Sequence, residues 1–291
     1  MNRLKRIIHE AIEKINPNAA IQTIKPISGG DINQAYRVQT NSTIYFVKIN
    51  QDVPSNFFKF EANGIQLIKD TNTIAVPYVH YYNEPKQHEH AILIMDWIEG
   101  QATAKTTIEL GQQIASLHQH SHSMYGYDQD GFIGSLSQVN HFTDTWVGYF
   151  RDYRLRPLLH IASERGRLPY ERYTKLEKLM NDLDNWIPSF PKASLLHGDL
   201  WGGNWLTGAN GKPYLIDPAV FYGDHLFELA FTELFGGFPD DFYKAYNEVM
   251  PIEDYYNDVK PLYQLYYLLI HLTLFGEGYG SSVDRILHRY V

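Results

Sequence analysis

The spacing of apolar residues changes once along this chain, near residue 96, and that change limits the possible folds more than any other feature. Before it, apolar residues alternate in short runs between turn residues, which indicates strands. After residue 100 they recur mainly at helical spacing. A β-rich first third and a helical remainder predict an α+β fold of two lobes with a cleft between them: lobes at 1–95 and 101–291, and a hinge at 96–100.

The first lobe is predicted to contain two helices and a small antiparallel sheet. The opening segment is amphipathic, and Glu10 and Glu13 among its basic residues favour packing against the lobe over binding to a membrane surface. A second helix is expected at 56–69. Strands are predicted at 24–27, 34–38 and 43–49 and on both sides of the charged turn 84–90.

The second lobe is predicted to be mainly helical, with one short β insertion. Within the insertion, the pair Asn210-Gly211 favours a tight hairpin between two strands. The insertion covers 194–196 and 205–216, and helices are expected at 106–118, 142–159, 170–183, 226–235 and 255–275.

Composition excludes several classes of protein. The chain has no cysteine, so it has neither disulfides, nor a thiolate zinc site, nor a cysteine nucleophile. A net charge of −8 argues against a nucleic-acid partner. The most apolar stretch, 262–275, is shorter than the ~20 residues of a membrane span, and the charged N-terminus is unlike a signal peptide. We therefore expect a soluble, cytoplasmic protein with no nucleic-acid or membrane partner.

The strongest chemical signal is a His-Gly-Asp turn at 197–199, which follows an apolar strand. Asn204 comes five residues after Asp199, and Asp217 follows the second strand of the predicted hairpin. The hairpin would bring Asp199, Asn204 and Asp217 to one end of a small sheet. Two carboxylates and a carboxamide there would suit Mg²⁺, which takes oxygen ligands and leaves places for phosphate oxygens. The alternative is an ordinary cap at Asp199 and a turn at Asp217.

A lysine and a glutamate of the first lobe are both expected on apolar faces. In the strand 44–49, the period of two places Lys48 with Ile44 and Phe46, and in the next helix Glu61 shares a stripe with apolar residues. Each charge needs a partner there, so we predict that Lys48 pairs with Glu61 and reaches a nucleotide phosphate. A purely stabilising ion pair is the alternative.

Two further stretches of the first lobe are candidate nucleotide contacts. One is the turn formed by Ser28, Gly29 and Gly30, which comes one strand before the strand of Lys48. Backbone N–H groups of such a turn can approach phosphates. The other is the segment at the lobe junction, where backbone groups could bind the edge of an adenine. It comprises Met95, Asp96, Trp97 and Ile98.

The histidines show no metal-ligand spacing, and neither a zinc-protease motif nor a hydrolase nucleophile motif is present. Histidine-based metal or nucleophile chemistry is therefore not expected. Surface or capping roles are predicted for His118, His120 and His122.

The order of the acidic and amide groups matches that of protein kinases. There, the Asp of an Asp-x-x-x-x-Asn loop is the base, the Asn holds a metal ion, and a later Asp holds metal as well. A protein kinase would also need a peptide-docking segment that ends in Ala-Pro-Glu. Here the next predicted helix starts at Leu226, within ten residues of Asp217. That spacing favours a small or side-chain-borne substrate.

The chain resembles the fructosamine kinase family, also called ketosamine kinases, within a wider group related to aminoglycoside and choline kinases. The resemblance runs over nearly the full length and is most specific at 196–204, 215–223 and 228–238. The wider group usually has His-Pro where this chain has Trp201-Gly202. That tryptophan and the Thr-Glu-Leu-Phe-Gly-Gly-Phe stretch that ends at Phe238 narrow the resemblance to the fructosamine kinases.

This resemblance implies a protein-kinase-like fold and ATP-dependent phosphorylation of a sugar hydroxyl on a ketosamine, a deglycation activity on amino acids or protein lysines. It implies that Asp199 is the proton acceptor, that Asn204 and Asp217 hold Mg²⁺, and that Lys48 with Glu61 orients the phosphates of ATP. Some members form a redox-linked dimer through a cysteine, which this chain lacks. A monomer is therefore expected.

Trp201 is predicted to form a wall of the acceptor pocket, because it lies two residues beyond Asp199 and its ring can pack on a sugar or bind an ammonium group. Packing between the loop and the helical lobe is the alternative for this residue. For the whole chain, the alternatives are a kinase of another hydroxylated amine, such as an aminoglycoside, choline or a thiosugar, and a catalytically inactive nucleotide-binding module.

Overall fold

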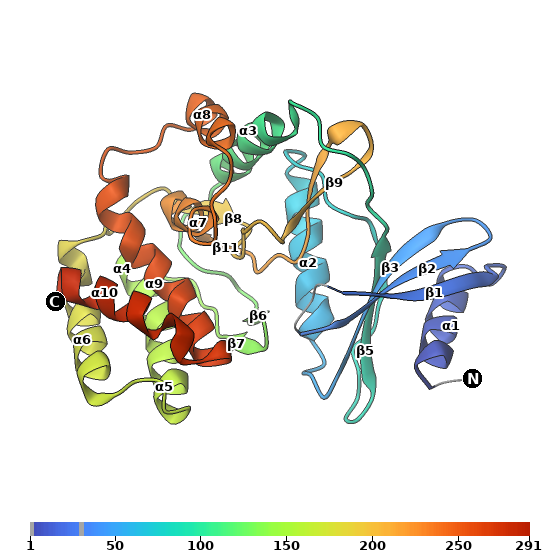
Figure 1. Ribbon diagram of the computed structural model, residues 1–291, viewed down its shortest axis with the longest axis horizontal. Helices are drawn as coiled ribbons and strands as arrows, with labels where there is room; N and C mark the ends of the chain where they lie inside the picture. The colour runs from blue at the N-terminus through green and yellow to red at the C-terminus, as the bar shows by residue number, and fades with distance from the viewer. Residues whose placement is uncertain (1–2, 29–31) are drawn as a thin grey trace. The chain divides into compact units, whose positions relative to one another are not determined.

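The computed structural model describes residues 3–28 and 32–291, which form two compact units (Figure 1). The first unit comprises Met1–Thr106, Gly131–Ser137 and Asn204–Ala219, and the second comprises Thr107–Asp130, Gln138–Gly203 and Val220–Val291. The first unit thus extends past the predicted hinge at 96–100 and includes 204–219, a segment expected with 101–291. The division into two lobes about that hinge stays a prediction.

A five-stranded antiparallel sheet forms the centre of the first unit. All five predicted strands are present, and most are slightly longer than expected. β1 pairs with β2 and β2 with β3, whereas β5 lies between β3 and β4. The strands are β1 (Ile21–Ile27), β2 (Gln34–Thr40), β3 (Ile44–Gln51), β4 (Val79–Tyr82) and β5 (His90–Asp96), in the spatial order β1-β2-β3-β5-β4.

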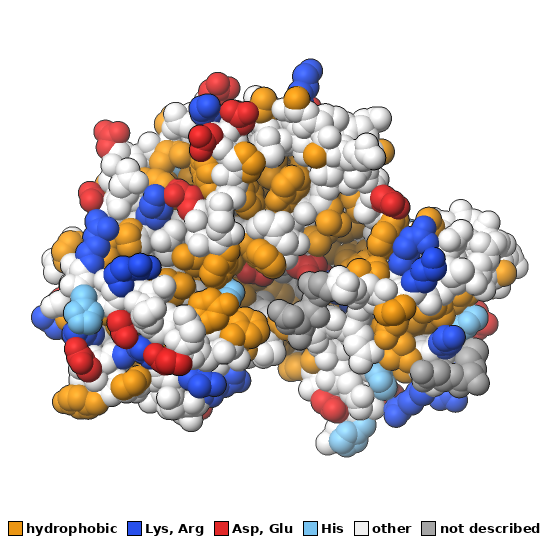
Figure 2. All heavy atoms as spheres, viewed as in Figure 1, with side chains coloured by type: hydrophobic (Ala, Val, Ile, Leu, Met, Phe, Trp, Pro, Cys, Tyr) orange, Lys and Arg blue, Asp and Glu red, His pale blue; other side chains and the backbone are white. Residues whose placement is uncertain are grey.

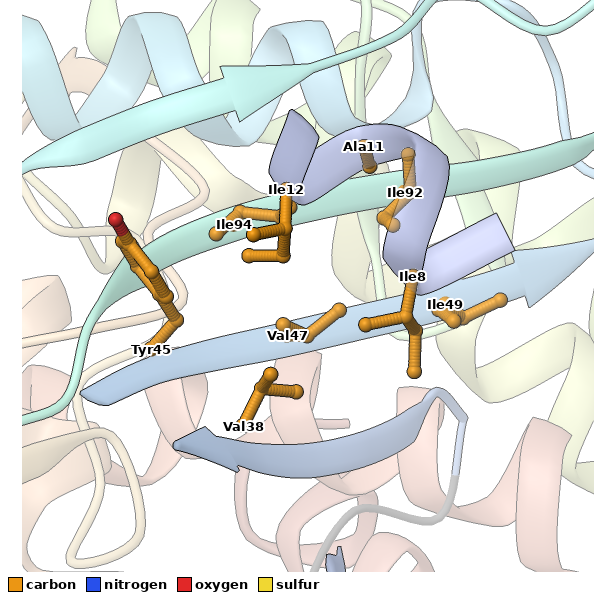
Figure 3. Packing of buried hydrophobic residues seen from close by; sticks show 9 residues of the cluster. All are labelled: Ile8, Ala11, Ile12, Val38, Tyr45, Val47, Ile49, Ile92 and Ile94. Atoms are coloured by element: carbon orange, nitrogen blue, oxygen red, sulfur yellow. The ribbon is translucent and has the colours of Figure 1, made fainter. Parts of the chain in front are cut away.

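Different helices cover the two faces of this sheet, because side chains along a strand alternate in direction. Helix α1 (Arg3–Ile15) packs its apolar side chains against alternate residues of β3 and β5, as Figure 3 shows. Helix α2 (Phe57–Asp70) packs against the opposite face, on Ala91, Leu93 and Met95 of β5, and Phe46 of β3 packs against the same cluster. The prediction that the opening helix packs against the sheet is therefore confirmed.

The predicted hairpin is formed by β9 (Trp205–Thr207) and β10 (Pro213–Leu215), which pair antiparallel and belong to the first unit. Its connection is longer than the tight turn that the sequence favoured, since 208–212 separate the two strands. Asn210 and Gly211 both have left-handed backbone there, with φ of 59° and 79°. The pair thus makes the bend within a five-residue loop.

The second unit is mainly helical, as predicted. Its small sheet pairs β8 (Ser194–Leu196) with β11 (Phe221–Gly223). No helix among the described residues is long and apolar enough to span a membrane. The helical elements are α3 (Thr106–Gln119), α4 (Trp146–Tyr149), the π-helical η1 (Phe150–Leu155), α5 (Arg156–Glu164), α6 (Tyr170–Asn181), η2 (Leu183–Asn185), α7 (His225–Thr232), α8 (Asp240–Val249), α9 (Tyr256–Phe275), η4 (Glu277–Tyr279) and α10 (Gly280–Tyr290).

The helix expected at 142–159 begins later and is not uniform. The Thr145 hydroxyl accepts a hydrogen bond from the N–H of Gly148 and so caps the first turn of α4. The π-helical stretch η1 then separates α4 from α5. Helices α8 and α10 were not predicted, and neither was the short hairpin of β6 (Gly131–Ile133) and β7 (Leu136–Gln138).

Candidate active site

Lys48 is in contact with two carboxylates of the first unit. Its Nζ atom lies 2.7 Å from Oε1 of Glu61 on α2 and 2.5 Å from Oδ1 of Asp217. The predicted contact of Lys48 with Glu61 is present, and Asp217 joins it as a third member. The exposed fraction of the side chain is 5% for Lys48, 12% for Glu61 and 36% for Asp217. The Asp217 carboxylate is therefore the group that a ligand can reach most easily.

This cluster places two carboxyl groups beside one ammonium group. Burial alone lowers the pKa of Lys48, but the carboxylates of Asp217 and Glu61 outweigh burial and raise it above its ordinary value. Burial raises the pKa of the Glu61 carboxyl above its ordinary value, although the Lys48 ammonium acts in the opposite direction. Both directions follow because two carboxylates share one ammonium group in a poorly solvated place. A further cation beside Asp217 would balance the second carboxylate of the cluster.

Asp217 lies beside Asn204 at one end of the hairpin β9–β10. Trp205 is opposite Leu215 in the hairpin, and the N–H of Ile216 donates to the carbonyl of Asn204 at 3.0 Å. Asp217 has left-handed backbone with φ of 57°, which is uncommon for a residue other than glycine. Backbone of this kind persists where the surrounding structure enforces it, and it clusters at functional sites.

The donor set at this end of the hairpin suits a hard divalent cation. The Asp217 carboxylate and the Asn204 carboxamide offer the oxygen ligands that Mg²⁺ prefers. Within 3–28 and 32–291, no three His, Asp or Glu side chains gather as a metal site. The remaining ligands would be water and phosphate oxygens, as is usual for Mg²⁺. These residues therefore fit the predicted ion.

The predicted His-Gly-Asp turn lies in the second unit, directly after β8. Gly198 has φ of 85°, a conformation that favours glycine. The N–H of Asp199 donates to Nδ1 of His197 at 3.3 Å. Glu228 of α7 holds the turn, because its Oε1 accepts from the N–H of Gly198 at 2.6 Å and its Oε2 from the N–H of His197 at 3.0 Å.

A buried chain of hydrogen bonds continues from Glu228 through the second unit. Nε2 of His118 lies 2.8 Å from Oε2 of Glu228, and Nδ1 of His118 lies 2.7 Å from the hydroxyl of Tyr246. That hydroxyl lies 2.8 Å from Nδ1 of His225, whose Nε2 contacts Glu253 at 3.0 Å. The surface or capping role predicted for His118 is wrong: its side chain is fully buried, because α3 directs it at the buried Glu228 carboxylate.

Glu228 is a positioning residue that was not predicted. Burial alone raises its pKa, but the hydrogen bond from His118 and the N–H of Gly198 outweigh burial, and the pKa lies below its ordinary value. The carboxylate is therefore ionised and accepts all three hydrogen bonds. The sequence does contain a signal for Glu228, because this residue stands between Phe227 and Leu229 in an apolar helix. Glu61 likewise stands among apolar residues in its helix.

We expect Glu228→Gln to destabilise the second unit. A carboxamide would place an NH₂ group against one of three donors that the carboxylate now satisfies. Such a loss costs about 1–3 kcal/mol of unfolding free energy, measurable by denaturant titration. Glu253→Gln, at the exposed end of the same chain, is the control and should cost far less. Equal losses in the two variants would contradict a positioning role for Glu228.

Trp201 and two glycines follow the turn in the second unit. Trp201 is 41% exposed. Its indole lies across Gly203, since a Cβ at that position would be 2.4 Å from Cζ2 and 2.5 Å from Cη2 of the ring. A Cβ at Gly202 would meet no atom of the described residues within 4 Å. The missing side chain at Gly203 is therefore what allows the indole to lie against the loop.

The predicted glycine turn falls only partly within the described residues. Gly29 and Gly30 lie outside them, and Ser28, the residue before, is exposed. Beyond the turn, Nδ2 of Asn50 donates to Oδ1 of Asn33 at 2.7 Å. Because Asn50 belongs to β3, this contact ties the residue before β2 to the strand that carries Lys48.

The predicted adenine-binding segment comprises the end of β5 and the residues after it. Met95 is buried in the core between the sheet and α2. The N–H of Asp96 donates to the carbonyl of Tyr78 at 3.0 Å, and its carboxylate accepts from the N–H of Tyr78 at 3.0 Å. Trp97 and Ile98 are half-buried. Because the N–H of Asp96 is already paired with Tyr78, it is not a candidate donor to an adenine edge.

Comparison with known proteins identifies the family to which this chain is similar. The model of that family, described as fructosamine kinase, matches residues 3–291. A protein of Lactiplantibacillus plantarum named probable ketoamine kinase is 38% identical over 280 residues, which cover 94% of this chain and 96% of that protein. The chloroplastic protein-ribulosamine 3-kinase of Oryza sativa subsp. japonica is 34% identical over 275 residues, which cover 93% of this chain and 79% of that protein.

Solved structures agree with this result. A crystal structure from Haemophilus somnus that carries the name of a fructosamine-3-kinase is 27% identical, covers 97% of both chains and has a TM-score of 0.85. An aminoglycoside phosphotransferase in complex with ADP and hygromycin B is 14% identical, with a TM-score of 0.64 over 99% of this chain and 96% of its own, and shares the fold alone. The predicted α+β, protein-kinase-like fold is confirmed. This chain belongs to the fructosamine kinase family and is a kinase, a phosphotransferase that acts on a hydroxyl group.

Proposed function

We propose that this chain transfers the γ-phosphoryl group of ATP to a sugar hydroxyl of a ketosamine, a sugar rearranged after condensing with an amine. The observation that supports this most is the buried Lys48 between Glu61 and Asp217. A stabilising ion pair needs only one acid. The second, partly exposed carboxylate adds a place for a cation and for the phosphates that accompany it.

On the nucleotide side, Lys48 would bind the phosphates of ATP while Glu61 holds its ammonium group in place. The raised pKa of Lys48 keeps that ammonium ionised in its buried position. Asp217 and Asn204 would hold Mg²⁺, which when bound neutralises phosphate charge and orients the transferred group.

On the acceptor side, Asp199 would accept the proton of the attacking hydroxyl. The hydroxyl oxygen forms a bond to the γ-phosphorus while the bond from that phosphorus to the β–γ bridging oxygen breaks, and ADP leaves. Glu228 would support this step by holding the N–H groups of His197 and Gly198, the two residues before Asp199. The direction of the Asp199 carboxylate is thereby tied to α7.

The acceptor is proposed to be a ketosamine of the fructosamine or ribulosamine type, free or carried on a protein lysine. Relatives named ketoamine kinase and protein-ribulosamine 3-kinase support this class. A kinase of aminoglycosides is not favoured, since the phosphotransferase of that kind shares the fold alone. Phosphorylation of such adducts would serve deglycation. Action in the cytoplasm as a monomer stays a prediction from the sequence.

An ATP-consumption screen tests this proposal. The purified protein, with ATP and Mg²⁺, is offered fructosyl-, ribulosyl- and erythrulosyl-lysine beside aminoglycosides and choline. We expect ADP release that depends on a ketosamine and stays at background with the other amines. Faster turnover of an aminoglycoside or of choline would contradict the substrate class. ATP binding without transfer to any acceptor would instead indicate an inactive nucleotide-binding protein.

Trp201 is proposed to form one wall of the acceptor pocket. Its partly exposed indole can pack on the C–H groups of a sugar and attract a protonated amine. We expect Trp201→Ala to raise the KM for ketosamines about 2- to 30-fold, which corresponds to a cation–π contact of roughly 0.5–2 kcal/mol. The KM for ATP and the Tm should change little, because the ring is not part of the core.

The neighbouring glycines provide a matched pair of variants for this prediction. Gly203→Ala places a methyl group 2.4 Å from the indole and must displace it, so this variant should reproduce the KM increase of Trp201→Ala. Gly202→Ala adds the same methyl group in open space and should leave the KM unchanged. A lower Tm with an unchanged ketosamine KM in Gly203→Ala would make Trp201 a packing residue.

A further inference from the structure

A row of aromatic contacts leads from the His-Gly-Asp turn to the surface of the second unit. The hydroxyl of Tyr267, on α9, donates to the carbonyl of Gly198 at 3.1 Å. The Tyr267 ring stacks on Phe231 of α7, with ring centroids 3.6 Å apart and planes at 2°. Both rings are buried. They connect the backbone next to Asp199 to aromatic side chains on α9 and in the segments that follow α7 and α9.

Four further side chains continue this row and are here called the aromatic patch: Phe235, His271, Phe275 and Tyr279. The centroid of the Phe235 ring lies 6.0 Å from that of Phe231 and 4.6 Å from that of His271. The His271 ring in turn lies 5.1 Å from Tyr279 and 5.6 Å from Phe275. The four rings therefore form one contiguous group.

The aromatic patch is open to solvent, with 41% of Phe235 and 54% of Phe275 exposed. Figure 2 shows hydrophobic side chains, in orange, at several places on one face of the molecule. Single exposed apolar residues are common, but here two exposed rings are joined through the half-buried His271 into one group, which indicates a binding surface. Burial lowers the pKa of His271 below its ordinary value, so its ring adds no positive charge to the patch at neutral pH.

We infer that the aromatic patch binds the carbon chain that the ketosamine nitrogen carries, such as the side chain of a modified lysine. This inference rests on the proposed function and adds which part of the acceptor the patch recognises. Helix α9 rises about 1.5 Å per residue, so His271 and Phe275 lie roughly 6 and 12 Å along it from Tyr267. A sugar hydroxyl at Asp199 would thus leave the amine substituent within reach of these rings.

The chemistry of the aromatic patch fits this occupant. Ring faces pack on methylene groups and attract an ammonium group. A methylene chain gains more from such a surface than a sugar does, because the hydroxyl groups of the sugar must keep their hydrogen bonds. Among ketosamines with the same sugar, a longer apolar chain on the nitrogen should therefore lower the KM.

The test compares two acceptors that share one sugar. Fructosyl-lysine carries a four-methylene chain on its nitrogen, whereas 1-amino-1-deoxyfructose carries none. We expect Phe275→Ala and Phe235→Ala each to raise the KM for fructosyl-lysine at least about 4-fold, the equivalent of one buried methylene group. The KM for 1-amino-1-deoxyfructose and the KM for ATP should stay unchanged.

Phe190→Ala is the matched control, because it removes a phenyl ring that is 75% exposed in the same unit and lies outside the aromatic patch. It should leave the ratio of the two KM values unchanged. The same ratio in the patch variants as in the wild type, with both acceptors turned over, would overturn this inference alone. No turnover by the wild-type protein of either acceptor, or of the same pair built on ribulose, would overturn the proposed function, and the inference with it.

Discussion

Asp199→Ala is expected to lower kcat for phosphoryl transfer to a ketosamine by about 10²–10⁴-fold, the usual loss when a positioned base is removed. The hydroxyl would then have to attack without an acceptor for its proton. ATP binding should be nearly intact, because Lys48, which is proposed to bind its phosphates, and Glu61 and Asp217, which are proposed to hold that lysine and Mg²⁺, belong to the other unit.

Two measurements separate these effects in Asp199→Ala. Single-turnover assays at saturating ATP and Mg²⁺ report the chemical step, and calorimetric titration with a non-hydrolysable ATP analogue reports binding. Asp184→Ala, which removes an exposed carboxylate from the same unit, should keep full activity. Activity of Asp199→Ala within about threefold of the wild type would remove Asp199 from the mechanism.

Asp217→Asn is expected to weaken Mg²⁺-dependent ATP binding by at least about 10- to 100-fold. The loss of even a supporting partner of a metal ligand typically costs about that much in metal affinity, and a direct ligand should cost no less. The variant also removes one of the two carboxylates that contact Lys48. Less negative charge would then remain to hold the cation.

The affinity for ATP, titrated over a range of Mg²⁺ concentrations, checks this expectation. Asp52→Asn is the matched control, because Asp52 also has left-handed backbone in the first unit, with φ of 58°, and its side chain is 67% exposed. It removes one charge at a comparable backbone position. An unchanged Mg²⁺ dependence in Asp217→Asn would count against its assignment as a metal ligand.

The sheet of the first unit could be predicted because its strands are short apolar runs separated by turn residues, and their side chains alternate between two covered faces. In β3, Val47 and Ile49 face α1, while Phe46 packs on the side of α2. The helices α8 and α10 could not be predicted in the same way. Helix α10 packs against α9, the α-helix before it, but also against α6, far earlier in the chain, and no local pattern reports the second contact.

The candidate site was predictable where a charge stood alone on an apolar face. Lys48 and Glu61 are 13 residues apart in neighbouring elements, so local periodicity was enough to pair them. The contact of Lys48 with Asp217 joins residues 169 positions apart, and that of Glu228 with His118 joins residues 110 apart. No local pattern reports contacts of that kind, which is why His118 was predicted at the surface.

Phosphorus NMR of the complete reaction tests the proposed phosphoryl transfer most directly. The wild-type protein is incubated with ATP, Mg²⁺ and either fructosyl-lysine or ribulosyl-lysine, beside matched reactions that contain Asp199→Ala. We predict a phosphate-ester resonance coupled to a proton on a sugar carbon, formed at the expense of ATP and absent with the variant. Release of inorganic phosphate without an ester, or an ester of equal amount with Asp199→Ala, would contradict the proposed reaction and its base.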